Sequence, residues 1–217
     1  MDDQKHYEMG DPADMAIRDA VPAYHVLLLP AEVARLKARA EEHARQKGLR
    51  HAGEHWEGTY LAAWGFWYLV HEELGKWITY DAEEPNPLLL RGDGRWPRIR
   101  IEGEELWMRV RFRHHREFLA GGRYFGRKLV VFDSVDQEPP DYLVPATVLS
   151  HSDGSSSVGF FGVVSRDIIE EERRKQTPRP PSGAGKGGSA NIPISADRFD
   201  AARFSELLAN AEPSGRE

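Results

Sequence analysis

Polar and apolar residues alternate most regularly along residues 96–115. Arginines alternate with isoleucines over residues 98–101, and residues 106–113 repeat the alternation after the polar turn Glu102-Gly103-Glu104-Glu105. A period of two residues is typical of a β-strand with one buried face, so the sequence predicts a hairpin here. Its apolar face carries isoleucine, methionine, valine and phenylalanine, and its other face carries arginine.

Two segments before the hairpin have apolar residues at helical spacing. Pro30 opens the first, in which Val33, Leu36 and Ala40 predict one buried face of a helix. The second covers residues 51–76 and has aromatic side chains over a broad arc. Such a helix is too aromatic to face solvent, so we expect it to lie in the core.

Short apolar runs predict the remaining strands, at residues 24–29, 77–80, 128–133, 142–150 and 157–164. Pro145 suggests that its strand lies at a sheet edge or bends there, because proline cannot donate to a ladder. Ser165 can cap a short helix over residues 166–175. This order predicts an α/β (α+β) fold, with a central mixed β-sheet flanked by helices.

The segments also predict how the chain is divided. Residues 1–20 are acidic and lack periodicity, which predicts a disordered N-terminus. Residues 21–175 form the α/β domain, and residues 176–192 are a linker or loop rich in proline, glycine and serine. Residues 193–211 contain an apolar stripe that predicts a C-terminal helix packed on the domain.

Composition limits the function classes. The net charge of the 217 residues is -6, which excludes a protein that is basic throughout, yet residues 91–128 hold eleven Arg/Lys against five Asp/Glu. The chain has no cysteine, which excludes disulfides, thiolate zinc sites and cysteine nucleophiles. No apolar run is long enough for a membrane span, and the polar N-terminus is unlike a signal peptide. We therefore expect a cytoplasmic protein without membrane contact.

The arginine face of the hairpin is the main candidate site. Arginine grips phosphate oxygens with a planar fork, and an aromatic ring on the same face can stack on a base. The pattern predicts contact with nucleic acid, DNA being favoured, while the alternative is a solvated face paired with neighbouring glutamates. The candidate binding residues are Arg98, Arg100, Trp107, Arg109, Arg111, Arg113, Arg123 and Arg127.

Several segments of the chain follow one another in an order that is also found in a known group of proteins. A long helix carries Glu57 in HWEGTYLAAW, a strand and loop carry Asp93 in RGDGRWPRIRI, and the hairpin ends in WMRVRFR. DYLV at residues 141–144 and GFFGVVSRDII at 159–169 follow. Over about residues 52–172, this order resembles the PD-(D/E)XK nuclease superfamily, whose fold is called restriction-endonuclease-like.

The resemblance implies a metal-dependent endonuclease in which acids hold Mg²⁺ or Mn²⁺ and a lysine assists an attacking water. Asp93 and Glu57 are then the metal ligands, and Glu105 is a further catalytic candidate. The chain departs from the motif on the hairpin, since Arg109 stands at the second acid and Arg111 at the lysine. An arginine repels a cation instead of binding it.

Two interpretations of this departure stay open. Glu57, Asp93 and Glu105 could form a rearranged carboxylate cluster, with Lys76 or Lys128 supplying the amine. Alternatively, the metal site is lost, no cofactor is needed, and the arginines remain as a phosphate-binding surface. We favour the second interpretation.

A different class of function is a non-enzymatic interaction module. Its arginine face would then bind an acidic protein partner. The sequence leaves the oligomeric state open.

Overall fold

The computed structural model describes residues 7–9, 20–50, 52–79, 97–114, 129–135, 137–176 and 191–215. Most strands belong to one main sheet, which is mixed as predicted. Only β5 and β7 run parallel among its neighbouring pairs, and the other pairs are antiparallel. The order across the sheet is β1 (Tyr7–Met9), β2 (Tyr24–Leu28), β8 (Ser156–Phe160), β7 (Tyr142–Ser150), β5 (Glu104–His114), β4 (Arg98–Ile101) and β3 (Ile78–Thr79), with β9 (Val164–Ser165) beside the start of β7.

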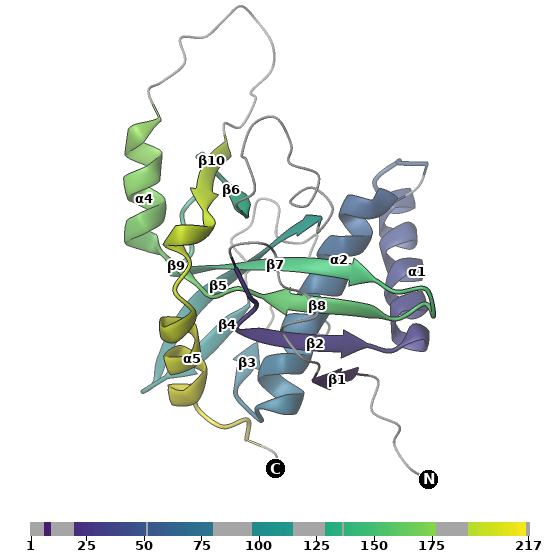
Figure 1. The fold of residues 1–217 in the computed structure, drawn as a ribbon, viewed down its shortest axis with the longest axis horizontal. Coiled ribbons are helices and arrows are strands. Elements are labelled where there is room, and N and C mark those ends of the chain that lie inside the picture. The colour runs from purple at the N-terminus through teal and green to yellow at the C-terminus, as the bar shows by residue number, and fades with distance from the viewer. Residues whose placement is uncertain are drawn as a thin grey trace, which may run out of the picture.

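One face of the main sheet is covered by helices α1 (Pro30–Gln46) and α2 (Gly53–Trp67), and α2 continues as a π-helical segment, η2 (Tyr68–Glu73). Figure 1 shows α2 crossing behind the main sheet. Met108, Val110 and Phe112 of β5 are buried in the core that includes residues of these helices. The apolar face of the hairpin is therefore the face that α2 covers.

The opposite face meets a second, two-stranded sheet and helix α4 (Arg166–Lys175). This sheet pairs β6 (Val130–Ser134) with β10 (Asn191–Ser195), and Figure 1 shows β10 and α4 at the far end of the view from α1. The buried residues of this separate core are Val131, Leu143, Val164, Ile169, Ile192 and Ile194.

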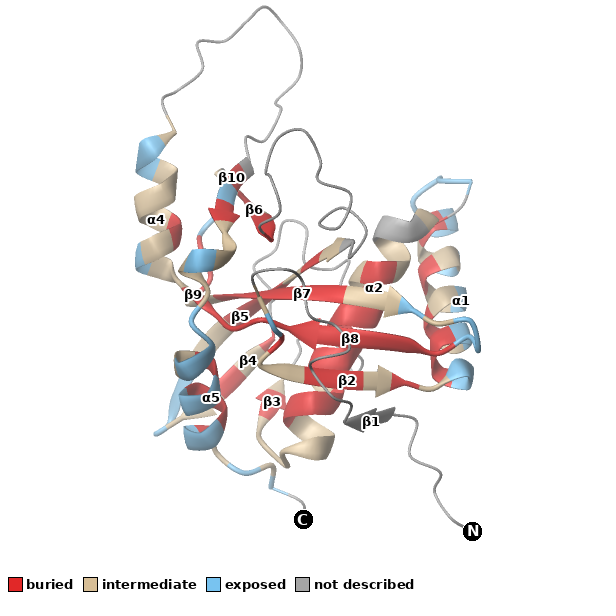
Figure 2. Cartoon of the chain, viewed as in Figure 1, coloured by how far each residue is buried: buried red, intermediate tan, exposed pale blue. Residues whose placement is uncertain are grey.

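The last helix, α5 (Ala201–Asn210), turns its apolar stripe inward as predicted. The Phe204 ring stacks on Phe66 of α2 at 6.4 Å between centroids and meets Tyr24 edge-on at 5.4 Å. Figure 2 shows the resulting contrast along α5 between buried and exposed residues. In the described part of the chain, no helix is both long and apolar enough to cross a bilayer.

The predicted hairpin forms, and its turn is tighter than the sequence suggested. Ile101 pairs with Glu104, so only Glu102 and Gly103 lie between the strands. Both have positive φ, at 52° and 84°. That geometry suits the twist of a two-residue hairpin loop, in which glycine has no steric cost. The close turn places Glu104 and Glu105 in β5.

Predictions for three segments differ from the structure. Of the edge or bend that Pro145 predicted, the edge is wrong, since β7 pairs with β5 on one side and with β8 and β9 on the other, while the bend stays a prediction. Pro145 lies where the antiparallel partner of β7 changes from β9 to β8. Tyr7–Met9 pairs with β2, so part of the N-terminal segment that was predicted to be disordered forms a strand. The segment predicted as one C-terminal helix begins with β10 and a 3-10 turn, Ala196–Arg198, before α5.

The close approach of α2 to β5 gives a testable consequence. A Cβ added at Gly58 would lie 2.1 Å from Cζ of Phe112, whose ring is held in the core. We expect Gly58→Ala to lower the free energy of unfolding by roughly 3 kcal/mol, because overpacking moves α2 away from the sheet. Urea unfolding measures this change. Gly215→Ala is the control, since nothing lies within 4 Å of its Cβ, and equal midpoints for the two variants would contradict the packing.

Candidate nucleic-acid interface

The arginines of β4 and β5 share one face of the main sheet, opposite α2. Arg98 is the register partner of Trp107, and Arg100 is the partner of Glu105. Directly opposite residues on neighbouring strands point to the same side. The arginines of both strands therefore lie on one face of the sheet, as the alternation predicts, and Trp107 lies on the same face.

At the hairpin end, two arginines pack on two tryptophans. The Arg100 guanidinium carbon lies 4.0 Å from the centroid of the Trp77 ring, and the Arg98 carbon lies 5.6 Å from that of Trp107. Glu105 stands between them and accepts hydrogen bonds from both, at 3.1 and 3.2 Å. We call Trp77, Arg98, Arg100, Glu105 and Trp107 the hairpin surface.

The hairpin surface is partly exposed to solvent, and its charged side chains form ion pairs. The side chains of Arg98, Arg100 and Glu105 are 24, 35 and 35% exposed. Hydrogen bonds from Arg98 and then Arg100 hold the pKa of the Glu105 carboxyl below its ordinary value. The carboxylate is therefore ionised at neutral pH, and it orients both guanidinium groups on the sheet.

Further along β5 the same face is buried. Asp133 of β6 is 0% exposed, and one of its oxygens, Oδ1, accepts hydrogen bonds from Arg109 and, at 2.9 Å, from Arg111. Arg109 also donates to Gln137 Oε1 at 2.8 Å. Burial lowers the pKa of Arg109 to about 10, against the attraction of Asp133, and nearby Arg111 and Arg173 lower it further.

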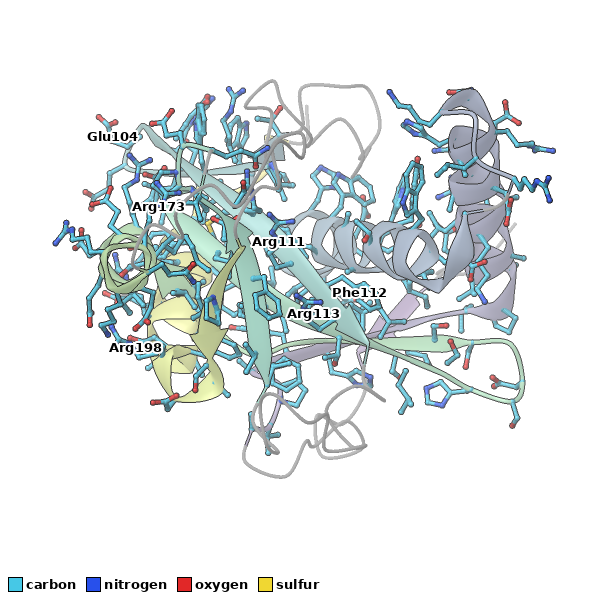
Figure 3. All side chains as sticks on the ribbon, turned by 90° about the horizontal axis from the view of Figure 1, so that it is seen from above. Glu104, Arg111, Phe112, Arg113, Arg173 and Arg198 are labelled. Atoms are coloured by element: carbon cyan, nitrogen blue, oxygen red, sulfur yellow. The ribbon has the colours of Figure 1, made fainter. Side chains whose placement is uncertain are left out.

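Arg109 is therefore not an open phosphate contact, which corrects the sequence prediction. It is 2% exposed because the second sheet lies over it and Asp133 supplies its counter-charge. The sequence did contain a signal, since Asp133 is the single acid at the end of the apolar run KLVVFD. Arg111 stays 36% exposed, and Arg113 packs on the Phe132 ring at 4.4 Å. Figure 3 shows Arg111 and Arg113 along the strand.

Of the predicted catalytic residues, the three that the structure describes, Glu57, Glu105 and Arg111, do not converge. Glu57 lies on α2, on the other side of the sheet from Arg111 and Glu105, and its carboxylate pairs with Lys37 Nζ at 3.4 Å. Lys76, the amine of the rearranged cluster, donates to two carbonyls at the end of α5, those of Ala209 and Ala211. Within the described ranges, no three histidines or acids are placed to hold a metal ion. Glu57 and Glu105 thus do not share a metal site among the described residues, and the metal site with Asp93 that the resemblance implies stays a prediction.

Asp93, Arg123, Arg127 and Lys128 lie outside the described residues. Comparison with protein-family models, with curated proteins and with solved structures gives no match.

The Arg109–Asp133 pair generates a stability prediction. Asp133→Asn keeps the shape of the side chain but leaves Arg109 buried without a counter-charge, which typically costs about 3–5 kcal/mol. Chemical unfolding monitored by circular dichroism should show this loss. Glu171→Gln, which weakens surface pairs with Arg198 and Lys175, should have little effect.

A second variant separates charge from packing. The double substitution Arg109→Met with Asp133→Leu removes both charges and keeps apolar volume, so it should be more stable than Asp133→Asn. An Asp133→Asn protein with the denaturation midpoint of the parent would show that the pair contributes nothing.

Proposed function

We propose that this chain is a nucleic-acid-binding protein, DNA being the favoured target, that grips phosphates through the hairpin surface. The observation that carries the proposal is the pairing of two partly exposed arginines with two tryptophans on one face of the sheet. Guanidinium groups bind phosphate oxygens with a planar fork, and aromatic rings stack on bases. The hairpin surface offers both kinds of contact side by side.

The order of elements supports a restriction-endonuclease-like relationship. Helix α2 is followed by β3, by the hairpin β4–β5, by β6 and β7, and by β8 and β9, which lead into α4. That is the order in which the sequence segments resemble the nuclease superfamily. We include this relationship, and a cytoplasmic location in keeping with the absence of cysteine, in the proposal.

Binding without cleavage is the form of the proposal that the geometry favours. Glu57 and Arg111 lie on opposite sides of the main sheet, and Glu105 is engaged by Arg98 and Arg100. Hydrolysis through a divalent metal needs carboxylates that converge on the ion. The described residues offer no such group.

The second candidate, an interaction module for an acidic protein, is favoured by one observation. Glu105 already occupies both arginines of the hairpin surface, so this surface accepts a carboxylate. An acidic side chain of a partner could take the place of Glu105. Phosphate and carboxylate ligands compete for the same guanidinium groups.

The test uses fluorescently labelled single-stranded DNA, duplex DNA and RNA, with dissociation constants measured over a series of salt concentrations. Arg98→Gln or Arg100→Gln should weaken binding across sequences and reduce the log–log salt slope by about 1 each. Glu105→Gln should tighten binding, because it removes the carboxylate that competes for both arginines. Arg174→Gln is the matched control, since this arginine on α4 is 78% exposed and Glu170 is its ion-pair partner among the described residues.

The outcomes separate the two candidates. No nucleic-acid binding by the parent protein at low salt would overturn the proposal, and salt-sensitive binding of polyglutamate in its place would support the acidic-partner alternative. Incubation of plasmid with Mg²⁺ or Mn²⁺ tests cleavage. Nicked or linear product that persists in a pure preparation would contradict a binder that does not cut.

A further inference from the structure

The chain after α5 returns to the main sheet at the hairpin surface. Trp77 donates its backbone N–H to the carbonyl oxygen of Glu212 at 2.6 Å, and Glu212 donates its own N–H to the carbonyl oxygen of Arg100 at 2.7 Å. Trp77 and Arg100 adjoin the last pair of β3 with β4, so Glu212 bridges the two strands where their ladder ends. Ser214 donates in turn to the carbonyl oxygen of Gly75 at 2.8 Å. The backbone on both sides of Glu212 is therefore held in place.

The side chain of Glu212 reaches the turn of the hairpin. Its Oε1 accepts a hydrogen bond from the backbone N–H of Gly103 at 2.7 Å, and its Oε2 lies 4.0 Å from Nη1 of Arg100. The first contact is a charge-assisted hydrogen bond, while the second is too long for a hydrogen bond. The two oxygens of one carboxylate thus face two donors, a turn amide and a guanidinium group.

These two donors make an anion site that the protein fills with its own side chain. Backbone N–H groups of tight turns commonly bind anions, and arginine binds oxyanions with its planar fork. Gly103 is exposed, and the side chains of Arg100 and Glu212 are each 35% exposed. Solvent and a ligand can therefore reach the donors once the carboxylate moves away.

Two carboxylates compete with a ligand for Arg100, and Glu212 is held more weakly than Glu105. Glu105 accepts hydrogen bonds from both Arg98 and Arg100, at 3.1 and 3.2 Å. Glu212 accepts one from an amide and is joined to Arg100 by the long pair alone. Exposed ion pairs contribute little to stability, because water replaces the lost partner. The side chain of Glu212 can therefore rotate away while its backbone stays bound to β3 and β4.

We propose that the Gly103 amide and Arg100 bind one phosphodiester group of a nucleic-acid strand, and that Glu212 is an internal competitor that occupies this site in the free protein. The inference rests on the proposed function and adds a means of regulating the hairpin surface. A phosphodiester carries one negative charge, as a carboxylate does, and its two unesterified oxygens can meet the same two donors. Glu212 then lowers the affinity for nucleic acid without contacting it.

The first experiment measures the dissociation constant of labelled DNA by fluorescence anisotropy. Glu212→Gln keeps an acceptor for the Gly103 amide and both backbone contacts, and it removes only the charge. We expect this variant to bind about fivefold more tightly at low salt, the size of a surface ion pair. Its salt dependence should be steeper, because Arg100 then carries a counterion from solution that phosphate releases.

Glu102→Gln is the matched control for this experiment. It makes the same change of charge in the same turn, and Glu102 forms no ion pair with a described residue. We expect it to change the affinity by less than about twofold, because its charge is exposed and screened. Urea unfolding of both variants checks that their midpoints match that of the parent. If the parent binds DNA and Glu212→Gln binds no better than Glu102→Gln, the internal competitor is refuted.

A double-mutant cycle tests whether Glu212 acts through Arg100. In an Arg100→Gln background, Glu212→Gln should tighten binding much less than it does in the parent, because the guanidinium group for which it competes is gone. Equal tightening in both backgrounds would reveal a general charge effect and overturn the site.

The amide resonance of Gly103 reports on the site directly in a ¹⁵N–¹H spectrum. Glu212→Gln should move it upfield, because a charge-assisted hydrogen bond becomes a neutral one, and saturating DNA should move it downfield again. The amide resonance of Ser214 should stay in place, since the backbone of the tail remains bound. DNA that binds this variant without moving the Gly103 resonance would rule out a phosphodiester at the turn.

Failure of the proposed function would give a different result. In that case neither the parent nor Glu212→Gln binds nucleic acid at low salt, whereas failure of the internal competitor alone leaves DNA binding by the parent intact. Polyglutamate is the probe for an acidic partner. If Glu212→Gln binds polyglutamate more tightly than the parent does and binds no DNA, the site takes a carboxylate and the phosphodiester is excluded.

Discussion

The ion pair between Arg109 and Asp133 determines how the two sheets are joined. Asp133 faces the main sheet beside the apolar residues of β6 and β10, where an unpaired carboxylate would carry a large desolvation cost. Its counter-charge comes from the middle of β5, a strand of the main sheet. The pair thus restricts β6 to the register that places Asp133 over Arg109. With β6 in that register, β10 pairs with it and α4 closes the small core that contains Ile169 and Ile192.

Local pattern was sufficient for most of the fold. The alternation along β4 and β5 predicted the hairpin and the face of each side chain, and helical spacing predicted α1, α2 and α5. The central position of β7 could not be predicted from the sequence, because a proline within a strand favours an edge or a bend. Pro145 is tolerated in the centre of the sheet because the antiparallel partner of β7 changes from β9 to β8 at this residue. Strand β10 was missed for a similar reason. Residues 191–195 (NIPIS) are few and include a proline, so the strand is recognised only from its pairing with β6.

The candidate site was less predictable, because alternation tells which residues share a face and not what covers it. Arg98 and Arg109 lie on the same face of neighbouring strands, yet Arg98 is partly exposed to solvent and Arg109 is buried beneath β6. The proposed alignment with a nuclease motif fixed the position of Arg111 along the chain. It could not fix the side of the sheet on which Arg111 lies relative to Glu57, which depends on how α2 packs against Phe112.

Two carboxylates hold the arginines on this face of the sheet, and they do so in different ways. The hairpin surface is organised by Glu105, an exposed carboxylate that a ligand can displace with little cost because water replaces its partners. Arg109 and Arg111 are held by Asp133, which is buried and cannot be displaced without leaving an unpaired charge in the core. The anchor that joins the two sheets is therefore separate from the hairpin surface that we propose for phosphate contact.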